Sequence, residues 1–269
     1  MKNSKIAFIG AGNMATSLIR GLVAKGANPS NIAACDLDQE KLDALHDACG
    51  IRTGTLEALA SIADVLVLAV KPQGMETVCS ALRAALGERR PLLISIAAGI
   101  PLRSLEAWLG SEQAIVRCMP NTPALVLQGA TGLFANTKTN AAQATLAGDI
   151  LSAVGIICWL DKEEDIDAVT ALSGSGPAYY FLLMEAMEQA ALKMGLTAEV
   201  ARQLTLQTAL GAATLAAGSD VPADELRRRV TSPGGTTEAA ITHFESAGFR
   251  EVVADAIFAA QKRSIELAG

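Results

Sequence analysis

The sequence predicts an α/β protein, with a doubly wound parallel sheet of the Rossmann type over residues 1–160 and an α-helical domain over residues 161–269. Three observations predict this architecture. Strand and helix patterns alternate through the first half, as expected for parallel βαβ units. A glycine-rich turn joins the first strand to the first helix. From residue 163 onwards the apolar spacing is typical of helices only.

The first strand, turn and helix form a candidate dinucleotide site. Residues 5–9 give a short apolar strand pattern, and an amphipathic run follows the turn. In such a turn Gly10 permits the tight bend, Gly12 lets the backbone approach a pyrophosphate, and Ala15 packs the helix closely on the sheet. A glycine-rich connection in an unrelated α/β domain is the alternative. The candidate cofactor-binding residues of the turn are Gly10, Ala11, Gly12, Asn13 and Met14.

Asp36 bears on the choice of cofactor. It follows the second strand pattern, residues 31–35, where an acid in this type of unit hydrogen-bonds the ribose hydroxyls. A carboxylate there favours NAD and repels the 2′-phosphate of NADP, and no arginine follows closely to compensate. The residue chemistry therefore favours NAD(H).

The alternation of strands and helices continues to residue 119. Buried strand patterns at residues 63–70, 91–98 and 114–119 alternate with helical runs at 75–86 and 102–109. Ligands of doubly wound sheets bind at the carboxyl ends of the strands. We therefore expect one crevice to be lined by the segments that follow the strands, namely Gly10–Met14, Asp36, Val70–Pro72, Ala97–Gly99 and Met119–Thr122.

The second domain is predicted to be helical and to form a dimer. Helical patterns cover residues 163–172, 177–192, 198–217, 223–230 and 250–267. These helices are rich in alanine and apolar on more than one face, which is typical of a core completed by a partner subunit. We expect a homodimer, and a higher assembly of dimers stays open.

Residues 230–240 contain the strongest candidate for a substrate site. Pro233 and the pair Gly234–Gly235 break the preceding helix, and Thr236 or Thr237 can cap the next one. A helix start combines unpaired backbone N–H groups with the positive end of the helix dipole, which suits a carboxylate. An ordinary glycine-proline turn with a cap is the alternative.

A second hydroxyl-rich break, Ser173–Pro177, precedes the first long helix of this domain. It predicts either another wall of the substrate pocket, with Ser175 as a substrate contact, or a helix break with a cap.

Composition narrows the ligand to a small solute. The net charge of −6 and the pI near 5.1 argue against nucleic acid and anionic membranes, which both need a basic protein face. Apolar runs such as residues 65–70 are far shorter than the roughly 20 residues of a membrane span, and no signal-peptide pattern is present. The five widely spaced cysteines are typical of buried positions in a reducing compartment, so we expect a cytoplasmic protein. His46 and His243 lack metal-ligand spacing, and no metal site is expected.

The loop chemistry indicates the kind of acceptor. A nicotinamide cofactor transfers hydride, and the protein has to position the acceptor carbon. Residues 230–240 contain no His, Lys or Cys, so their best donors are hydroxyls and backbone N–H groups. Such donors suit an acceptor that is already electrophilic, such as a protonated imine, which requires orientation more than general acid catalysis.

Six motifs together resemble the Δ1-pyrroline-5-carboxylate reductase family, and they span nearly the whole chain in order. They are Gly10–Met14, Ala69–Pro72, Ser95–Gly99, Arg117–Ala124, Ser173–Ala178 and Val230–Thr237. The stretches Met119–Pro123 and Ser232–Thr237 are far more specific than the glycine-rich turn. The resemblance implies reduction of a cyclic imine acid to L-proline by NAD(P)H, in a homodimer whose substrate site lies by the subunit interface.

Carried over by position, the resemblance also implies site residues. The hydroxyl of Thr237 would hydrogen-bond the ring nitrogen, and the backbone of the loop would hold the carboxylate. The implied substrate-binding residues are Ser232, Gly234, Gly235, Thr236, Thr237 and Ser175. The cofactor would also be bordered by Thr55, Val70, Lys71, Pro72, Ala97, Ala98 and Asn121. Thr55 is a departure, because many members carry an Asn there.

The family commonly prefers NADPH whereas Asp36 favours NAD, so both NADP(H) and NAD(H) stay open. Two other functions also stay open. A β-hydroxyacid or 6-phosphogluconate-type dehydrogenase would place a catalytic lysine on a helix of the second domain, and Lys193 lies near a helix end without that motif. The other is a dinucleotide-binding protein without turnover.

Overall fold

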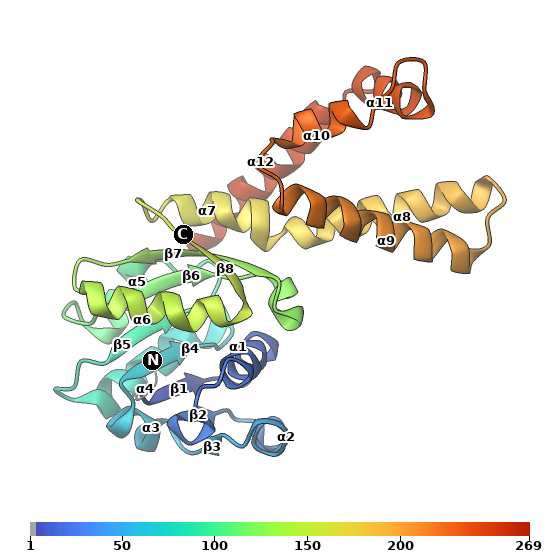
Figure 1. Ribbon diagram of the computed structural model, residues 1–269. Coiled ribbons are helices and arrows are strands. Elements are labelled where there is room, and N and C mark those ends of the chain that lie inside the picture. The colour runs from blue at the N-terminus through green and yellow to red at the C-terminus, as the bar shows by residue number, and fades with distance from the viewer. Residues whose placement is uncertain (1–3) are drawn as a thin grey trace. The chain divides into compact units, whose positions relative to one another are not determined.

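The computed structural model describes residues 4–269 (Figure 1). Contacts within the chain divide these residues into two compact units. The first unit comprises residues 4–175 together with Ala260–Gly269, and the second comprises Gly176–Ala259. The last helix of the chain therefore begins in the second unit and ends in the first.

Within residues 4–269, the first unit is built on one eight-stranded sheet with the order β3-β2-β1-β4-β5-β6-β7-β8. All neighbours from β3 to β6 pair in parallel, which confirms the predicted doubly wound sheet. The strand order reverses between β1 and β4, which is where ligands of such sheets bind. The strands are β1 (Ile6–Ile9), β2 (Ile32–Cys35), β3 (Arg52–Thr53), β4 (Val65–Leu68), β5 (Leu92–Ser95), β6 (Ile115–Met119), β7 (Gly129–Ala135) and β8 (Gly155–Trp159).

The sheet is not parallel throughout, because β7 runs antiparallel to β6. The chain leaves β6 at Met119 and enters β7 at Gly129, and the 3-10 turn Thr122–Val126 fills much of this connection. A parallel crossover needs a dozen or more residues, so a reversal of direction is what fits here. Helix α6 (Ala141–Leu151) then gives the longer connection that lets β8 pair in parallel with β7.

Helices cover both faces of the sheet, and the strand residues alternate between two cores. In β1, Ile6 and Phe8 belong to one core, whereas Ala7 and Ile9 belong to the other. Residues of α1, α2 and α6 close the first core, and residues of α3, α4 and α5 close the second. The bounds of these helices are α1 (Asn13–Ala24), α2 (Gln39–Cys49), α3 (Leu56–Ile62), α4 (Met75–Leu86) and α5 (Leu102–Leu109).

The second unit is helical, as predicted, and its first two helices pack against each other (Figure 1). The helix predicted at residues 198–217 is confirmed without a shift. The next one ends at Arg229, one residue earlier than predicted. The helices are α8 (Gly176–Lys193), α9 (Ala198–Ala217), α10 (Ala223–Arg229), α11 (Thr236–Ser246) and α12 (Phe249–Ala268).

The helix predicted at residues 163–172 begins at Asp165 and changes from α-helical to π-helical geometry. An α-helix, α7, covers Asp165–Val169, and Thr170–Gly174 form a π-helical turn. Two hydroxyls of this turn donate to the carbonyl four residues earlier, Thr170 at 2.8 Å and Ser173 at 3.1 Å. Such bonds compete with regular helix geometry, and π-helical turns are frequent at functional sites.

All five cysteines lie in the described part of the chain and are free. Four are buried, as expected, but Cys158 is exposed. The expectation is wrong for Cys158 because β8 is the last strand of the sheet and most of its side chains are uncovered. Within residues 4–269, no helix has both the length and the apolar character needed to span a bilayer.

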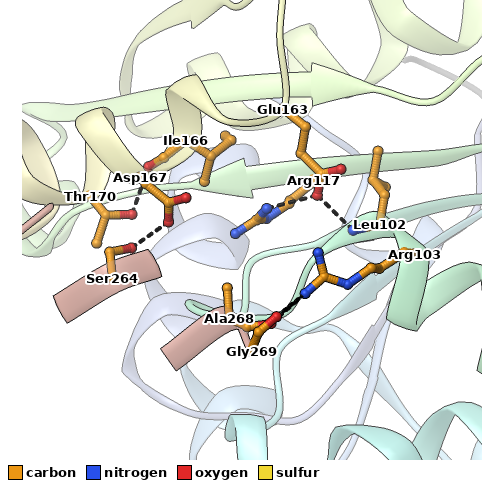
Figure 2. A network of polar contacts seen from close by, with 10 residues as sticks. All are labelled: Leu102, Arg103, Arg117, Glu163, Ile166, Asp167, Thr170, Ser264, Ala268 and Gly269. Atoms are coloured by element: carbon orange, nitrogen blue, oxygen red, sulfur yellow. Dashed lines mark hydrogen bonds and ion pairs between the residues drawn. The ribbon is translucent and has the colours of Figure 1, made fainter. Parts of the chain in front are cut away.

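A buried ion pair joins three elements of the first unit (Figure 2). The guanidinium of Arg117 on β6, which is 4% exposed, donates to Oε1 of Glu163 at 2.7 Å. The same oxygen accepts the N–H of Leu102, the first residue of α5, at 2.6 Å. One carboxylate therefore holds together β6, α5 and the segment that leads into α7.

The end of α12 is attached to the same unit by two further contacts (Figure 2). The hydroxyl of Ser264 donates to Oδ1 of Asp167 on α7 at 2.6 Å. The guanidinium of Arg103 on α5 donates to the carbonyl oxygens of Ala268, at 3.0 Å, and Gly269. The last turns of α12 are thus a fixed part of the first unit.

Glu163→Ala should lower the free energy of unfolding by about 3 kcal/mol, because it leaves the buried Arg117 guanidinium without its counterion. Urea unfolding at a fixed protein concentration would measure this change. The matched control is Glu112→Ala, which breaks an exposed pair with Lys138 and should cost less than about 1 kcal/mol. Equal losses for the two variants would contradict the anchoring role of Glu163.

Candidate active site

The glycine-rich turn begins at a position that requires glycine. Gly10 has a φ of +106°, and a Cβ at this residue would lie 2.6 Å from the carbonyl oxygen of Ala69. Its N–H donates to the carbonyl of Cys35 at 2.8 Å. The end of β1 therefore lies directly against the end of β2 and the segment after β4.

Gly12 meets a different requirement at the start of α1. Its backbone, with φ −73° and ψ 179°, is open to any residue, and no heavy atom lies within 4 Å of the position of a Cβ. In the described chain no side chain caps α1, and its first turn contains no acid. Free N–H groups beside open space are what a cofactor pyrophosphate requires, so the residues of the turn fit a dinucleotide.

Asp36, at the end of β2, is attached to the glycine-rich turn. Its Oδ2 accepts the N–H of Ala11 at 2.6 Å, and its Oδ1 accepts the N–H of Asp38 at 3.0 Å. The nearby Lys41 is itself paired with Asp38, at 3.0 Å. The carboxylate of Asp36 is thus fixed at the carboxyl edge of the sheet by two backbone N–H groups. Lys41 does not pair with it, because Lys41 pairs with Asp38.

Cys35 precedes this acid on β2. Burial raises the pKa of the Cys35 thiol to about 11, so the thiol is protonated at neutral pH. A protonated, buried thiol is a poor nucleophile, and Cys35 acts here as a small apolar residue.

Two of the other predicted cofactor residues have partners within the protein. Thr55 caps α3, because its hydroxyl accepts the N–H of Ala58 at 3.3 Å. The Asn121 side chain donates to the carbonyl of Ser173 at 3.0 Å and accepts the N–H of Ala130 at 2.9 Å. Asn121 thereby links β7 to the π-helical turn. The remaining predicted residues, Val70, Lys71, Pro72, Ala97 and Ala98, follow β4 and β5 at the same edge of the sheet.

A cavity of about 590 Å³ lies beyond the carboxyl ends of β4 and β5 in the first unit. Its sheet side is formed by Pro72, Gln73, Ala98, Gly99 and Ile100. Pro72 and Ala98 are predicted cofactor residues, so the cavity adjoins the predicted crevice.

The other side of this cavity comes from residues far apart in the sequence. They are Thr170 and Ser175, before α8, and Ala260, Arg263, Ser264 and Leu267 of α12. Ser175, which the sequence predicts as a substrate contact, lines this cavity. No sequence pattern marked the α12 residues as part of a site. Their helical spacing is the same as that of residues on a helix face exposed to solvent. They line the cavity only because the end of α12 returns to the first unit.

In the second unit, the predicted substrate loop makes a tight turn into α11. Gly234 has a left-handed backbone, with φ +69°, and Gly235 is the N-cap. The predicted cap at Thr236 or Thr237 is wrong, because α11 already begins at Thr236 and no side chain caps it within the described residues. The N–H of Gly235 donates to the carbonyl of Ser232 at 3.0 Å, which closes the turn.

The start of α11 offers several hydrogen-bond donors and one acid, Glu238. The N–H of Gly234 donates to Oε2 of Glu238 at 2.7 Å, a contact that the sequence did not single out. With Gly234 and Gly235 engaged, the next free donors are the N–H groups of Thr236, Thr237 and Glu238. Within residues 4–269 the hydroxyls of Thr236 and Thr237 form no hydrogen bond, so they are available to a ligand.

Both parts of the chain match known families. Residues 163–267 match the family described as "Pyrroline-5-carboxylate reductase dimerisation". Residues 5–99 match the family described as "NADP oxidoreductase coenzyme F420-dependent". The two matches cover the glycine-rich turn and the helical region separately.

Full-length comparisons agree with one another. A pyrroline-5-carboxylate reductase of Pseudomonas aeruginosa is 58% identical over 270 residues, which cover 100% of this chain and 98% of the relative. The structure of such a reductase from Coxiella burnetii is 47% identical, with a TM-score of 0.96 over 99% of both chains. A pyrroline carboxylate reductase of Plasmodium falciparum, crystallised with NADP bound, is 33% identical, with a TM-score of 0.88 over 100% of both chains. The chain belongs to the pyrroline-5-carboxylate reductase family.

Proposed function

We propose that this chain reduces the C=N bond of Δ1-pyrroline-5-carboxylate to L-proline with a hydride from NAD(P)H, the last step of proline biosynthesis. The observation that carries the proposal is full-length similarity to enzymes with this activity in their names. Family membership leaves no support for a β-hydroxyacid dehydrogenase or for a dinucleotide-binding protein without turnover.

The first unit supplies the cofactor site in this proposal. The uncapped start of α1 and the open space at Gly12 support pyrophosphate binding by Gly10, Ala11, Gly12, Asn13 and Met14. Asp36 and Thr55 border the adenosine half. Val70, Lys71, Pro72, Ala97 and Ala98 border the rest of the cofactor, and Asn121 holds the π-helical turn beside it. When bound, NAD(P)H supplies the hydride.

The loop before α11 orients the imino acid. The free N–H groups of Thr236 and Thr237, joined by that of Glu238, donate to the substrate carboxylate at the positive end of the helix dipole. The left-handed Gly234 and the N-cap Gly235 shape the turn, with the exposed Ser232 beside it.

Thr237 acts on the ring nitrogen through its hydroxyl. In a protonated imine, hydride adds to the carbon and the electron pair of the C=N bond moves to the nitrogen, so no further proton is needed. The N–H of the protonated imine donates a hydrogen bond to the Thr237 hydroxyl oxygen, which orients the ring for this transfer, in agreement with the absence of His, Lys and Cys from the loop.

We also propose that the chain works as a homodimer. The matched family description names dimerisation, and α8 has only Gly176 and Ala191 buried. Large apolar side chains of the second unit are exposed, among them Tyr180, Phe181, Leu182, Leu204, Leu210, Val252 and Phe258. A largely apolar cavity of about 620 Å³ lies among α8, α11 and α12 in the same unit. Apolar surface of this extent is typical of protein interfaces.

Two further assignments remain proposals of the same kind. We divide the chain into a dinucleotide-binding domain, residues 1–160, and a substrate-binding and dimerisation domain, residues 161–269. The family match that begins at residue 163 supports this boundary, whereas contacts within the chain group residues 161–175 and 260–269 with the first unit. We place the protein in the cytoplasm, supported by five free cysteines.

Thr237→Ala should lower kcat/KM for Δ1-pyrroline-5-carboxylate by about 5- to 150-fold, because it removes a hydrogen bond of about 1–3 kcal/mol. Initial rates of NAD(P)H oxidation measure this, and wild-type turnover in the same assay tests the proposed function itself. The control is Thr242→Ala, an exposed threonine further along α11, which should leave the rate unchanged. Undiminished activity of Thr237→Ala would remove the hydroxyl from the mechanism.

Asp36→Ser should raise the ratio of kcat/KM for NADPH to that for NADH by about tenfold. The reason is that repulsion between unit charges about 4 Å apart near a protein surface amounts to roughly 1–4 kcal/mol. Steady-state rates with each cofactor give the ratio. Asp47→Ser removes the same charge from the far end of α2 and should leave it unchanged. If both variants give the wild-type ratio, Asp36 does not determine cofactor choice.

Light scattering coupled to size-exclusion chromatography should give a multiple of the 27.8 kDa chain mass, with the dimer as the smallest species at micromolar concentration. The exposed apolar faces of α8 and α9 would be costly to leave in water. A folded monomer under these conditions would refute the homodimer.

A further inference from the structure

The cavity beyond β4 and β5 is rich in donors and contains no acid. Of the described residues that line it, only Arg263 is charged. The neutral polar side chains are those of Gln73, Thr170, Ser175 and Ser264, and the remaining lining residues are apolar, proline or glycine. The hydroxyls of Thr170 and Ser264 already donate to Ile166 and Asp167. This leaves Gln73, Ser175 and Arg263 as donors toward a ligand, which suits an anionic or carbonyl oxygen.

Arg263 is available to bind such an oxygen. Its Nη1 donates to Oε2 of Glu266 at 2.8 Å, and the two side chains are 66% and 46% exposed. An exposed pair between neighbours on one helix contributes little, so a ligand carboxylate can compete with Glu266. A guanidinium also has five N–H donors in a fork that matches a carboxylate, and Glu266 engages one nitrogen in the described structure.

The position of Arg263 in the cavity is set by its neighbours. Ser264 is buried and donates to Asp167 at 2.6 Å (Figure 2). Gly99, after β5, has a φ of +73° and lies against Leu267, whose carbonyl oxygen would be 3.5 Å from a Cβ at that position. These two contacts hold the backbone of α12 at the cavity edge, and Arg263 is one of the residues that line the cavity.

We infer that Arg263 makes this cavity selective for acceptors that carry a carboxylate. The guanidinium supplies a positive charge at the strand ends where the hydride donor is expected, and it attracts an anionic ring imine there. The inference rests on the proposed function and adds a specificity-determining residue to it.

The test compares two acceptors that differ only in the carboxylate. Initial rates of NAD(P)H oxidation are measured with Δ1-pyrroline-5-carboxylate and with Δ1-pyrroline, for wild type, Arg263→Gln and Arg263→Lys. The matched control is Lys262→Gln, which removes the same charge from the neighbouring exposed residue outside the cavity.

Arg263→Gln should raise KM for the carboxylate acceptor about tenfold, as expected for the loss of one hydrogen bond to a charged group, with kcat within about twofold. KM for Δ1-pyrroline should not change, Arg263→Lys should be intermediate, and Lys262→Gln should match wild type. Glu266→Gln releases the guanidinium and should lower KM for the carboxylate acceptor.

An unchanged KM in Arg263→Gln, or an equal rise for both acceptors, would overturn the selective role of Arg263. A rise of KM in Glu266→Gln would contradict it as well. A wild-type protein that reduces neither acceptor would instead overturn the proposed function, and the inference with it. Thermal unfolding of each variant confirms that the comparison is made on folded protein.

Discussion

The close approach of the backbone at Gly10 to the carbonyl of Ala69 is the constraint on which the cofactor site depends. It brings the end of β1 against the segment after β4, at the point where the strand order reverses. The same turn opens the first N–H groups of α1 and receives the carboxylate of Asp36 at Ala11. A side chain at Gly10 would push these strand ends apart, and the donors would no longer converge on one edge of the sheet.

The chemistry of the two candidate binding regions is one of orientation and charge. At the start of α11 the donors are N–H groups and the hydroxyls of Thr236 and Thr237, and in the first-unit cavity the donors are Gln73, Ser175 and Arg263. None of these groups has to give up a proton when hydride adds to a protonated imine. This agrees with the scarcity of histidine in the chain and with the raised pKa of Cys35, which keeps that thiol protonated.

Burial differs sharply between the two units. The sheet has a core on each face, built from alternate residues of the same strands. In α8 and α9, by contrast, apolar side chains such as Phe181 and Leu210 remain exposed although their helices are regular. A helix pair with so few buried residues gains little from its own packing. The exposed apolar side chains of α8 and α9, together with the match to a dimerisation family, support burial of these helices against a second chain.

Local periodicity in the sequence was sufficient for the alternating strands and helices, the glycine-rich turn, and helix α9. These features depend on neighbours within one or two turns of chain, and the family motifs are local in the same way. Other features come from contacts between distant segments, which no local pattern encodes. Glu163 is shared between Arg117 and Leu102, and the π-helical turn holds its place through Asn121.

The clearest case is Arg263. The sequence by itself determined only that Arg263 is a charged residue in a helix. The helical pattern looks the same whether such a residue faces solvent or lines a binding site. Only the tertiary structure decided between the two, because Ser264 binds Asp167 and Leu267 packs on Gly99, so the end of α12 becomes a wall of the cavity. Helical spacing specifies which residues share a face, and the contacts of that face with the rest of the fold specify what they meet.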